Sequence, residues 1–319
     1  MSVPDQTPKT AAPPTLAASL FRLARPRQWA KSVFVLIGPL YGLSEPGRDV
    51  RTVLPAALLA AAAFALVSSA CYIVNDLADV KRDRQHPRKK HRPIASGAVK
   101  PSQAASLAAI LVLGALGILA ALPAGTAWWT FVALAAYALN VVLYSVSLKH
   151  VVMADVISLA MGFVLRVLGG CAATGTPPTT WLLNTSFFLA MFLAFCKRLG
   201  ERRLMRAAGG DAVNVRAVQS SYTDDLLKMS VVVTAVATLV TYALYVQAHE
   251  AGYTRGFNLL WLTMLPATYG LLRAIVVVER GEFDDPTEMA SRDWRIQLAG
   301  GLFVGMVVGL TAWKMSGGG

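Results

Sequence analysis

Long apolar stretches, separated by shorter polar connections, occupy most of the chain after residue 30. Nine of them are nearly free of charged residues: 31–45, 53–74, 103–122, 126–147, 152–173, 180–196, 227–248, 257–278 and 295–313. A helix of about 20 apolar residues is long enough to cross about 30 Å of hydrocarbon. The pattern therefore predicts an all-α membrane protein with nine transmembrane helices.

The segments outside these stretches differ in character. The first stretch is the shortest and begins at Lys31, and residues 16–26 before it mix Leu, Phe and Arg, as in an amphipathic helix at a membrane interface. Residues 1–15 are rich in Pro, Thr and Ala and predict a disordered tail, without the basic and apolar regions of a signal peptide. We expect one nine-helix domain over 16–314, followed by a flexible tail at 315–319.

Composition agrees with a membrane protein and excludes other classes. The chain is 55% hydrophobic and only 15% charged, whereas soluble domains carry about 25% charged residues. Its net charge of +12 would suit nucleic acid, but it has no aromatic stacking motif or zinc-finger spacing, so we expect no nucleic-acid partner. Cys71, Cys171 and Cys196 lie inside apolar stretches without metal-ligand spacing and predict buried thiols.

The distribution of cations predicts the orientation. With the N-terminus in the cytoplasm, 24 Lys and Arg residues fall on that side of the membrane and four on the other. Because cytoplasmic loops carry such an excess, we expect an inner-membrane protein with a cytoplasmic N-terminus and an external C-terminus. The polar loops 75–102, 197–226 and 279–294 then share the cytoplasmic face, and loops of this length are usually functional.

A cluster of polar side chains ends the second apolar stretch. Asn75, Asp79 and Asp83 are four residues apart and share one face of a helix, with Asp76 about a quarter-turn away. Mg²⁺ binds through a few such oxygen ligands together with substrate phosphates. We predict that Asn75, Asp79 and Asp83 hold Mg²⁺, and that Asp76, Asp79 and Asp83 are the catalytic carboxylates.

A dense cationic run follows this cluster directly, from Arg84 through Lys89 to Arg92. Metal-binding carboxylates next to cations at a membrane surface indicate a site for a metal-complexed pyrophosphate. A charged loop that only anchors a helix end is the structural alternative, but ordinary cytoplasmic loops need no carboxylates in helical register. His86 and His91 have no third ligand nearby, which argues against a transition metal.

These residues resemble a known family motif. The UbiA-type intramembrane prenyltransferase superfamily carries Asn-Asp-x-x-Asp-x-x-x-Asp followed by an Arg-Pro-Ile-Ala-Ser-Gly-like ending, as this chain does at 75–83 and 92–97. The resemblance covers roughly 20–313 and implies a nine-helix bundle with cytoplasmic active-site loops. It also implies a Mg²⁺-dependent transferase that releases pyrophosphate.

The second motif of that superfamily differs here. Members that donate a prenyl diphosphate carry a second aspartate-rich motif between the sixth and seventh helices. At that place this chain has Lys197, Arg198 and Glu201. Cations there favour a phosphate held without a second metal, since a guanidinium offers two parallel donors to phosphate oxygens.

One subgroup is similar at several further places, the decaprenyl-phosphate 5-phosphoribosyltransferases. The similar segments are 25–31, 148–150, 197–201, 221–223 and, less specifically, 285–293. The resemblance implies transfer of 5-phosphoribose from phosphoribosyl pyrophosphate to a polyprenyl phosphate, a step that feeds the synthesis of arabinosyl-lipid donors. The lipid is then the acceptor, which accounts for the changed second motif. The resemblance also adds Lys31, Lys149 and Tyr222 to the substrate-binding residues.

Four candidate site residues have structural alternatives. Lys31 and Lys149 could be cations that reach the membrane interface, and Tyr144 could belong to an interfacial aromatic belt. Arg166 lies near the middle of the fifth stretch, where an ionisable group costs at least ~2.5–3.5 kcal/mol. It either faces a polar cavity at the site or ties its helix to another. Asp155 shares its face but lies about 16 Å away along the helix, too far for an ion pair.

Two rival functions remain open. An aromatic prenyltransferase of the same superfamily would need a second aspartate pair, which the chain lacks. A transporter would place ionisable residues through the membrane midplane, where only Arg166 is found. We expect phosphoribosyl pyrophosphate, a polyprenyl phosphate and membrane lipid as partners, and the sequence leaves a homo-oligomer open.

Overall fold

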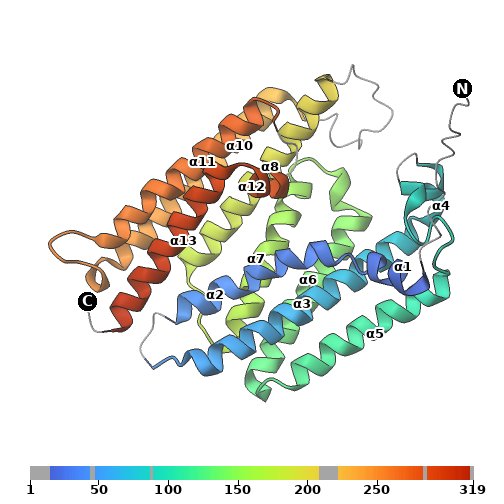
Figure 1. Cartoon of the computed structure of the whole chain (residues 1–319), viewed down its shortest axis with the longest axis horizontal. Helices are drawn as coiled ribbons and strands as arrows, with labels where there is room; N and C mark the ends of the chain where they lie inside the picture. Colours follow the sequence, from blue (N-terminus) through green and yellow to red (C-terminus); the bar gives the residue numbers. More distant parts are fainter. Residues whose placement is uncertain (1–14, 44–46, 87–88, 208–221, 283–285, 317–319) are drawn as a thin grey trace, which may run out of the picture.

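The computed structural model describes residues 15–43, 47–86, 89–207, 222–282 and 286–316, and most of the two expected tails lies outside them. The described residues form an α-helical bundle (Figure 1). Its helices are α1 (Leu16–Leu23), η1 (Pro26–Val33), α2 (Phe34–Gly42), α3 (Val50–Ala78), α4 (Val80–Gln85), η2 (Lys89–His91), α5 (Pro101–Ala120), α6 (Ala124–Val146), η3 (Leu148–His150), α7 (Ala154–Thr174), α8 (Thr180–Ala207), α10 (Asp224–Ala248), η5 (Glu250–Gly252), η6 (Leu259–Thr263), α11 (Met264–Glu279), α12 (Pro286–Arg292) and α13 (Trp294–Met315).

Eight helical segments in the described ranges are long and apolar enough to cross a membrane. They correspond to the second through ninth apolar stretches, so the all-α membrane class is confirmed. The first stretch, 31–45, forms the end of η1 and the nine-residue α2, which is too short by itself to meet the same criterion. α3 and α8 run further than expected, to Ala78 and Ala207, because helical structure continues where the hydropathy falls.

Polar caps define where several long helices begin. The Asp49 carboxylate accepts a hydrogen bond from the Arg51 amide at the start of α3, and Thr223 accepts one from Leu226 at the start of α10. Asp293 accepts from two amides at the start of α13. A side-chain oxygen at this position satisfies an otherwise unpaired donor, which stabilises a helix by typically ~1 kcal/mol.

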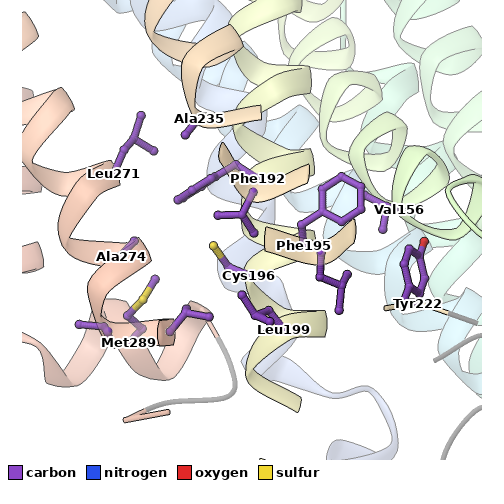
Figure 2. Packing of buried hydrophobic residues seen from close by; sticks show 14 residues of the cluster. Val156, Phe192, Phe195, Cys196, Leu199, Tyr222, Ala235, Leu271, Ala274 and Met289 are labelled. Atoms are coloured by element: carbon purple, nitrogen blue, oxygen red, sulfur yellow. The ribbon is translucent and has the colours of Figure 1, made fainter. Parts of the chain in front are cut away.

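The long helices form two groups that lie side by side in Figure 1. The first group is α3, α5, α6 and α7, and the second is α8, α10, α11 and α13; α7 packs on α8 and joins them. In the second group, Phe192, Phe195 and Cys196 of α8 lie between α11 and the buried pair Val156 and Tyr222 (Figure 2).

The outer surface of the bundle is apolar. On α13, Leu298, Leu302 and Val308 are each more than half exposed, and α5 exposes Ile110 and Leu113 in the same way. Exposed apolar surface on this scale is unfavourable in water. It agrees with helices that lie in lipid.

Glycines let α2 approach α7 closely. A Cβ atom at Gly170 would overlap the carbonyl oxygen of Val35, and one at Gly38 would overlap the Cys171 sulfur. Small residues that allow backbones to approach are a common basis of helix packing in membranes. These glycines hold α2 against α7 and place the segment before α2 beside the end of α3.

Gly170→Ala is expected to destabilise the protein by about 1–3 kcal/mol, because backbone atoms of α2 would have to move. The thermal unfolding midpoint of the purified, detergent-solubilised protein measures the effect. Gly117→Ala is the matched control, since a Cβ there meets no atom within 4 Å. Equal midpoints for the two variants would contradict this description of the α2–α7 contact.

Candidate functional site

The first motif lies where α3 passes into α4. The Asp79 amide donates to the carbonyl of Asn75 (3.0 Å), and the Asp83 amide donates to that of Asp79 (2.8 Å). These two hydrogen bonds connect the helices, although the helix is interrupted at Asp79, where α3 ends and α4 begins. Asp76 lies in α3 and Asp83 in α4, and both carboxylates reach the same arginine, Arg92.

Asp76 and Asp83 are buried and held by two arginines. One Arg25 nitrogen contacts both Asp76 carboxylate oxygens at 2.7 Å. Arg92 donates to Asp76 at 2.9 Å and to Asp83 at 2.7 Å. The two carboxylates are 3% and 2% exposed, so neither is open in this arrangement. Such charge-assisted hydrogen bonds are among the strong polar contacts in proteins.

Arg25 is a site residue that sequence reasoning did not single out. Its backbone φ of 52° lies in the left-handed region, which costs a non-glycine residue about 1–3 kcal/mol and is concentrated at functional sites. The turn directs the guanidinium to Asp76, and the same group lies 4.7 Å from the centre of the Tyr72 ring. The sequence feature that could have indicated Arg25 is its position as the first residue of the 25–31 segment, directly before Pro26.

Asn75 and Asp79 lie on the other edge of the motif. The Asn75 amide donates to Asp79 at 3.4 Å, and both residues are partly exposed. They line the polar end of a groove of about 350 Å³ between α3, α5 and α6. The rest of its lining is nearly all apolar and includes Cys71, Phe131 and Leu134. The motif is thus divided into a pair held by arginines and a pair beside an apolar groove.

Asp83 is buried against Arg92, whereas Asn75 and Asp79 are partly exposed and contact each other. The three residues therefore do not form one open set of metal ligands. Among the described residues, no three His, Cys, Asp or Glu side chains lie close enough together to hold a metal ion. Mg²⁺ usually takes one or two carboxylates and completes its shell with water and substrate phosphates. Asn75 and Asp79 fit that limited role, as neighbouring oxygen-bearing side chains that remain partly exposed.

A second polar cluster joins α7, α8 and the start of α10. Asp155 is fully buried and accepts hydrogen bonds from the Tyr222 hydroxyl (2.6 Å) and from Arg198 (3.2 Å). Arg198 also donates to Glu201 at 3.1 Å. The Tyr222 hydroxyl accepts from the amide of Met153 at 2.8 Å, and burial raises the pKa of Tyr222 above its usual value.

This cluster gives Arg198 a partner that the sequence did not suggest. Asp155 is indeed not paired with Arg166, as its distance along the helix predicted, and pairs with Arg198 instead. The guanidinium is 6% exposed and bound to two carboxylates. Lys197 precedes it on α8, and Tyr144 lies close enough to interact with it electrostatically.

Arg166 is buried without a carboxylate partner in the described part of the chain. It donates to the carbonyl of Gly162 (2.9 Å) and to the Tyr137 hydroxyl (2.7 Å), which in turn donates to Ser68 (3.2 Å). Its guanidinium stands 4.4 Å from the centre of the Tyr137 ring. The Arg166 Nε is buried and has no hydrogen-bond partner among the described residues. Its contacts on α6 tie two helices together, and its charge is left uncompensated.

The remaining predicted site residues lie on the ends and connections of the helices. Arg84 is exposed on α4, whereas Lys89 in η2, Lys149 in η3 and Lys31 in η1 are partly exposed. Within the described ranges, Arg84, Lys89 and Lys149 make no hydrogen bond or ion pair with the carboxylates of the two clusters. Ser221 and Asp285, which belong to segments that carried the resemblance, lie outside the described residues.

Ion pairs also join the ends of the second helix group. Arg202 contacts Asp224 at 2.7 Å, linking α8 to α10. Arg273 contacts Asp293 at 2.6 Å, linking α11 to the start of α13. The Arg273 guanidinium holds the pKa of the Asp293 carboxyl below its usual value. These contacts tie α8 to α10 and α11 to α13.

Known proteins resemble the chain in sequence and in fold. A decaprenyl-phosphate phosphoribosyltransferase from Mycolicibacterium smegmatis is 32% identical over 306 residues, which cover 92% of this chain and 93% of that protein. The Mycobacterium tuberculosis protein of the same name is 32% identical over 296 residues, covering 91% and 93%. A UbiA homologue from Archaeoglobus fulgidus, solved with GPP and Mg²⁺, superposes with a TM-score of 0.63 at 17% identity, covering 92% of this chain and 99% of that one.

The family comparison covers the helices between the two polar clusters and both clusters except Arg25. Residues 32–294 match the UbiA prenyltransferase family, which is most of the described bundle. The resemblance suggested by the first motif is thereby confirmed over nearly the whole chain. The chain belongs to the UbiA prenyltransferase family.

Proposed function

We propose that this protein transfers 5-phosphoribose from phosphoribosyl pyrophosphate to a polyprenyl phosphate such as decaprenyl phosphate, releasing pyrophosphate. The observation that carries the proposal is that the decaprenyl-phosphate phosphoribosyltransferases match over 91–92% of the chain. The second cluster supports it, because an arginine takes the place where a prenyl-donating enzyme would carry a second aspartate pair.

The proposal includes nine membrane passes. The η1 and α2 helices together span roughly 30 Å, from eight residues at about 2.0 Å and nine at about 1.5 Å. This length suffices for one further crossing. α1 and the C-terminal end of α13 lie at opposite ends of the bundle in Figure 1, which supports an odd number of passes. With the cation bias, the motif end and the N-terminus lie in the cytoplasm and the C-terminus outside the inner membrane.

Asn75 and Asp79 would hold Mg²⁺ on the pyrophosphate of the donor, with Asp83 four residues further along the chain, in α4. When bound, the ion supplies Lewis-acid stabilisation of the leaving pyrophosphate. Asp76 and Asp83 orient Arg25 and Arg92, whose guanidiniums lie on the other edge of the motif. Arg84 and Lys89 add positive charge around the same phosphates.

The acceptor side is proposed to use the second cluster and the buried cation. Arg166 offers a positive charge that has no carboxylate partner among the described residues, and a lipid phosphate entering from the membrane would compensate it. Arg198 binds one oxygen of the buried Asp155 carboxylate and Tyr222 binds the other, and Lys197 precedes Arg198 on α8. Further polar groups at this end of the bundle would complete the phosphate contacts: Lys31, Tyr144, Lys149 and Glu201.

The chemistry requires positioning rather than a strong base. The bond between the ribose C1 and the pyrophosphate oxygen breaks with its electron pair leaving on pyrophosphate. A lipid phosphate oxygen, already an anion at neutral pH, forms the new bond to C1. The developing positive charge at C1 and the anions on both sides are stabilised by the fixed arrangement of charges, which is usually the largest contribution to catalysis.

The test is an assay of the purified protein in lipid nanodiscs with labelled phosphoribosyl pyrophosphate, with and without Mg²⁺. We expect label to pass to decaprenyl phosphate only when Mg²⁺ is present. Parallel reactions offer a prenyl diphosphate with 4-hydroxybenzoate. Prenylation of the aromatic acceptor, with no use of phosphoribosyl pyrophosphate, would assign the rival activity. Turnover of neither pair by folded protein would reject both enzymes.

A further inference from the structure

A pocket of about 280 Å³ lies beside the first motif, on the side away from Asn75 and Asp79. It is formed where α1 and the turn before η1 meet the end of α3 and the segment after η2. Its lining residues are Arg22, Leu23, Arg25, Asp76, His91, Arg92 and Pro93. Four of the seven carry nitrogen donors, and only two are apolar.

The charges around this pocket do not balance. Arg25 and Arg92 are matched by the carboxylates of Asp76 and Asp83. Arg22 adds a third guanidinium, and its side chain has no hydrogen-bond or ion-pair partner within the described residues. His91 is likewise exposed at the rim. The pocket thus presents an excess of positive charge and free donors to whatever occupies it.

We propose that this pocket binds the 5-phosphate of the phosphoribosyl donor, with Arg22 and His91 as its specificity-determining residues. The inference rests on the proposed function and adds a subsite for the group that distinguishes this donor from a prenyl diphosphate. A phosphomonoester matches the donors present, because one guanidinium can donate two parallel hydrogen bonds to two phosphate oxygens.

The division of the motif into two edges indicates that this pocket binds the 5-phosphate, and not the pyrophosphate of the donor or the phosphate of the lipid. The donor carries its pyrophosphate on C1 and its phosphomonoester on C5, at opposite sides of the ribose, so it needs two separate subsites. Asn75 and Asp79, the residues available to Mg²⁺, do not line this pocket. The lipid phosphate is equally unsuited to it, since the apolar groove that could hold a prenyl chain lies on the opposite edge of the motif.

Binding of ribose 5-phosphate to the full-length protein in phosphatidylcholine nanodiscs tests the inference. We expect Arg22→Gln and His91→Gln each to weaken that binding, about tenfold or more for the arginine. Binding of inorganic pyrophosphate with Mg²⁺ should change less than about twofold, because no group on the metal-binding edge is altered. Arg27→Gln is the matched control, because Arg27 is an exposed arginine of the next helix, η1, and does not line the pocket.

Three results would overturn the inference. One is unchanged ribose 5-phosphate binding in Arg22→Gln and His91→Gln, and another is an equal loss of pyrophosphate binding. The third is measured in nanodiscs that also contain anionic phosphatidylglycerol: an effect of Arg22→Gln only on retention of that lipid would make the pocket a lipid headgroup site. Wild-type turnover of phosphoribosyl pyrophosphate is measured alongside, so that a misplaced subsite is distinguished from a wrong reaction.

Discussion

Asp79→Ala is expected to reduce phosphoribosyl transfer by at least about a thousand-fold, a loss of roughly 4 kcal/mol of transition-state stabilisation. Asp79 is the carboxylate of the motif that is not held by Arg25 or Arg92, and it stands beside Asn75. Its loss would leave no acidic ligand on the open edge of the motif. Initial rates measured over a range of Mg²⁺ concentrations, with protein folding checked by thermal unfolding, determine the effect.

Asp49→Asn is the control for this variant. Asp49 begins the same helix at its opposite end, and asparagine caps a helix about as well as aspartate. We expect wild-type rates and wild-type Mg²⁺ dependence from it. Near-normal activity of Asp79→Ala at limiting Mg²⁺ would show that the metal is held elsewhere.

Arg198→Met is expected to destabilise the protein by about 3–5 kcal/mol, the cost typical of removing one partner from a buried ion pair. Asp155 is fully buried, and without Arg198 its charge would keep only the Tyr222 hydroxyl among its side-chain partners in the described residues. Thermal unfolding of the purified protein measures the loss. Arg292→Met is the control, because its pair with Glu288 is exposed and should contribute at most about 1 kcal/mol.

A double variant separates the structural role of Arg198 from a substrate role. Asp155→Asn combined with Arg198→Met removes both charges, so much of the stability should return. If Arg198 also acts on a phosphate, this stable double variant remains poorly active, and its KM for one phosphate substrate rises. Recovery of both stability and activity would restrict Arg198 to the fold. No loss of stability in Arg198→Met alone would contradict the buried ion pair.

The membrane class and most of the bundle follow from the hydrophobic pattern alone. Eight of the nine expected stretches form helices able to span a membrane, because a run of about 20 apolar residues has few other stable arrangements. The stretch at 31–45 was harder to assess, since part of it is the more extended η1 helix and α2 contains Pro39. Hydropathy does not distinguish these helix types.

The sequence predicted that the residues of the first motif share one side of a helix. It did not predict that arginines hold two of them while the other two lie beside an apolar groove. Spacing places Asn75, Asp79, Asp83 and Asp76 on one arc of the helix. Which edge of that arc meets cations depends on Arg25, which lies 51 residues from Asp76. Such a contact is set by the packing of α1 and η1 against α3, and nothing in the local sequence specifies it.

The second cluster was not predicted either, because its contacts also join residues that are far apart in the sequence. Asp155 and Arg198 are 43 residues apart and belong to helices that meet where the two groups of the bundle join. Their charges were visible in the sequence, but each had several candidate partners. The phosphate roles of Lys31, Lys149 and Lys197 stay predictions, and so does the assignment of Mg²⁺.

The spacing of the two buried aspartates across the α3–α4 junction also limits where residues can be inserted or deleted in this protein. One residue inserted between Asp76 and Asp83 would turn the second carboxylate by about 100° and carry it about 1.5 Å along the axis. Arg92, which holds both carboxylates through one nitrogen, would then lose one of them. The count of residues between the two aspartates is therefore as strict a requirement as their identity. Side chains in this interval can be exchanged, whereas single insertions or deletions would separate the helix from its arginine.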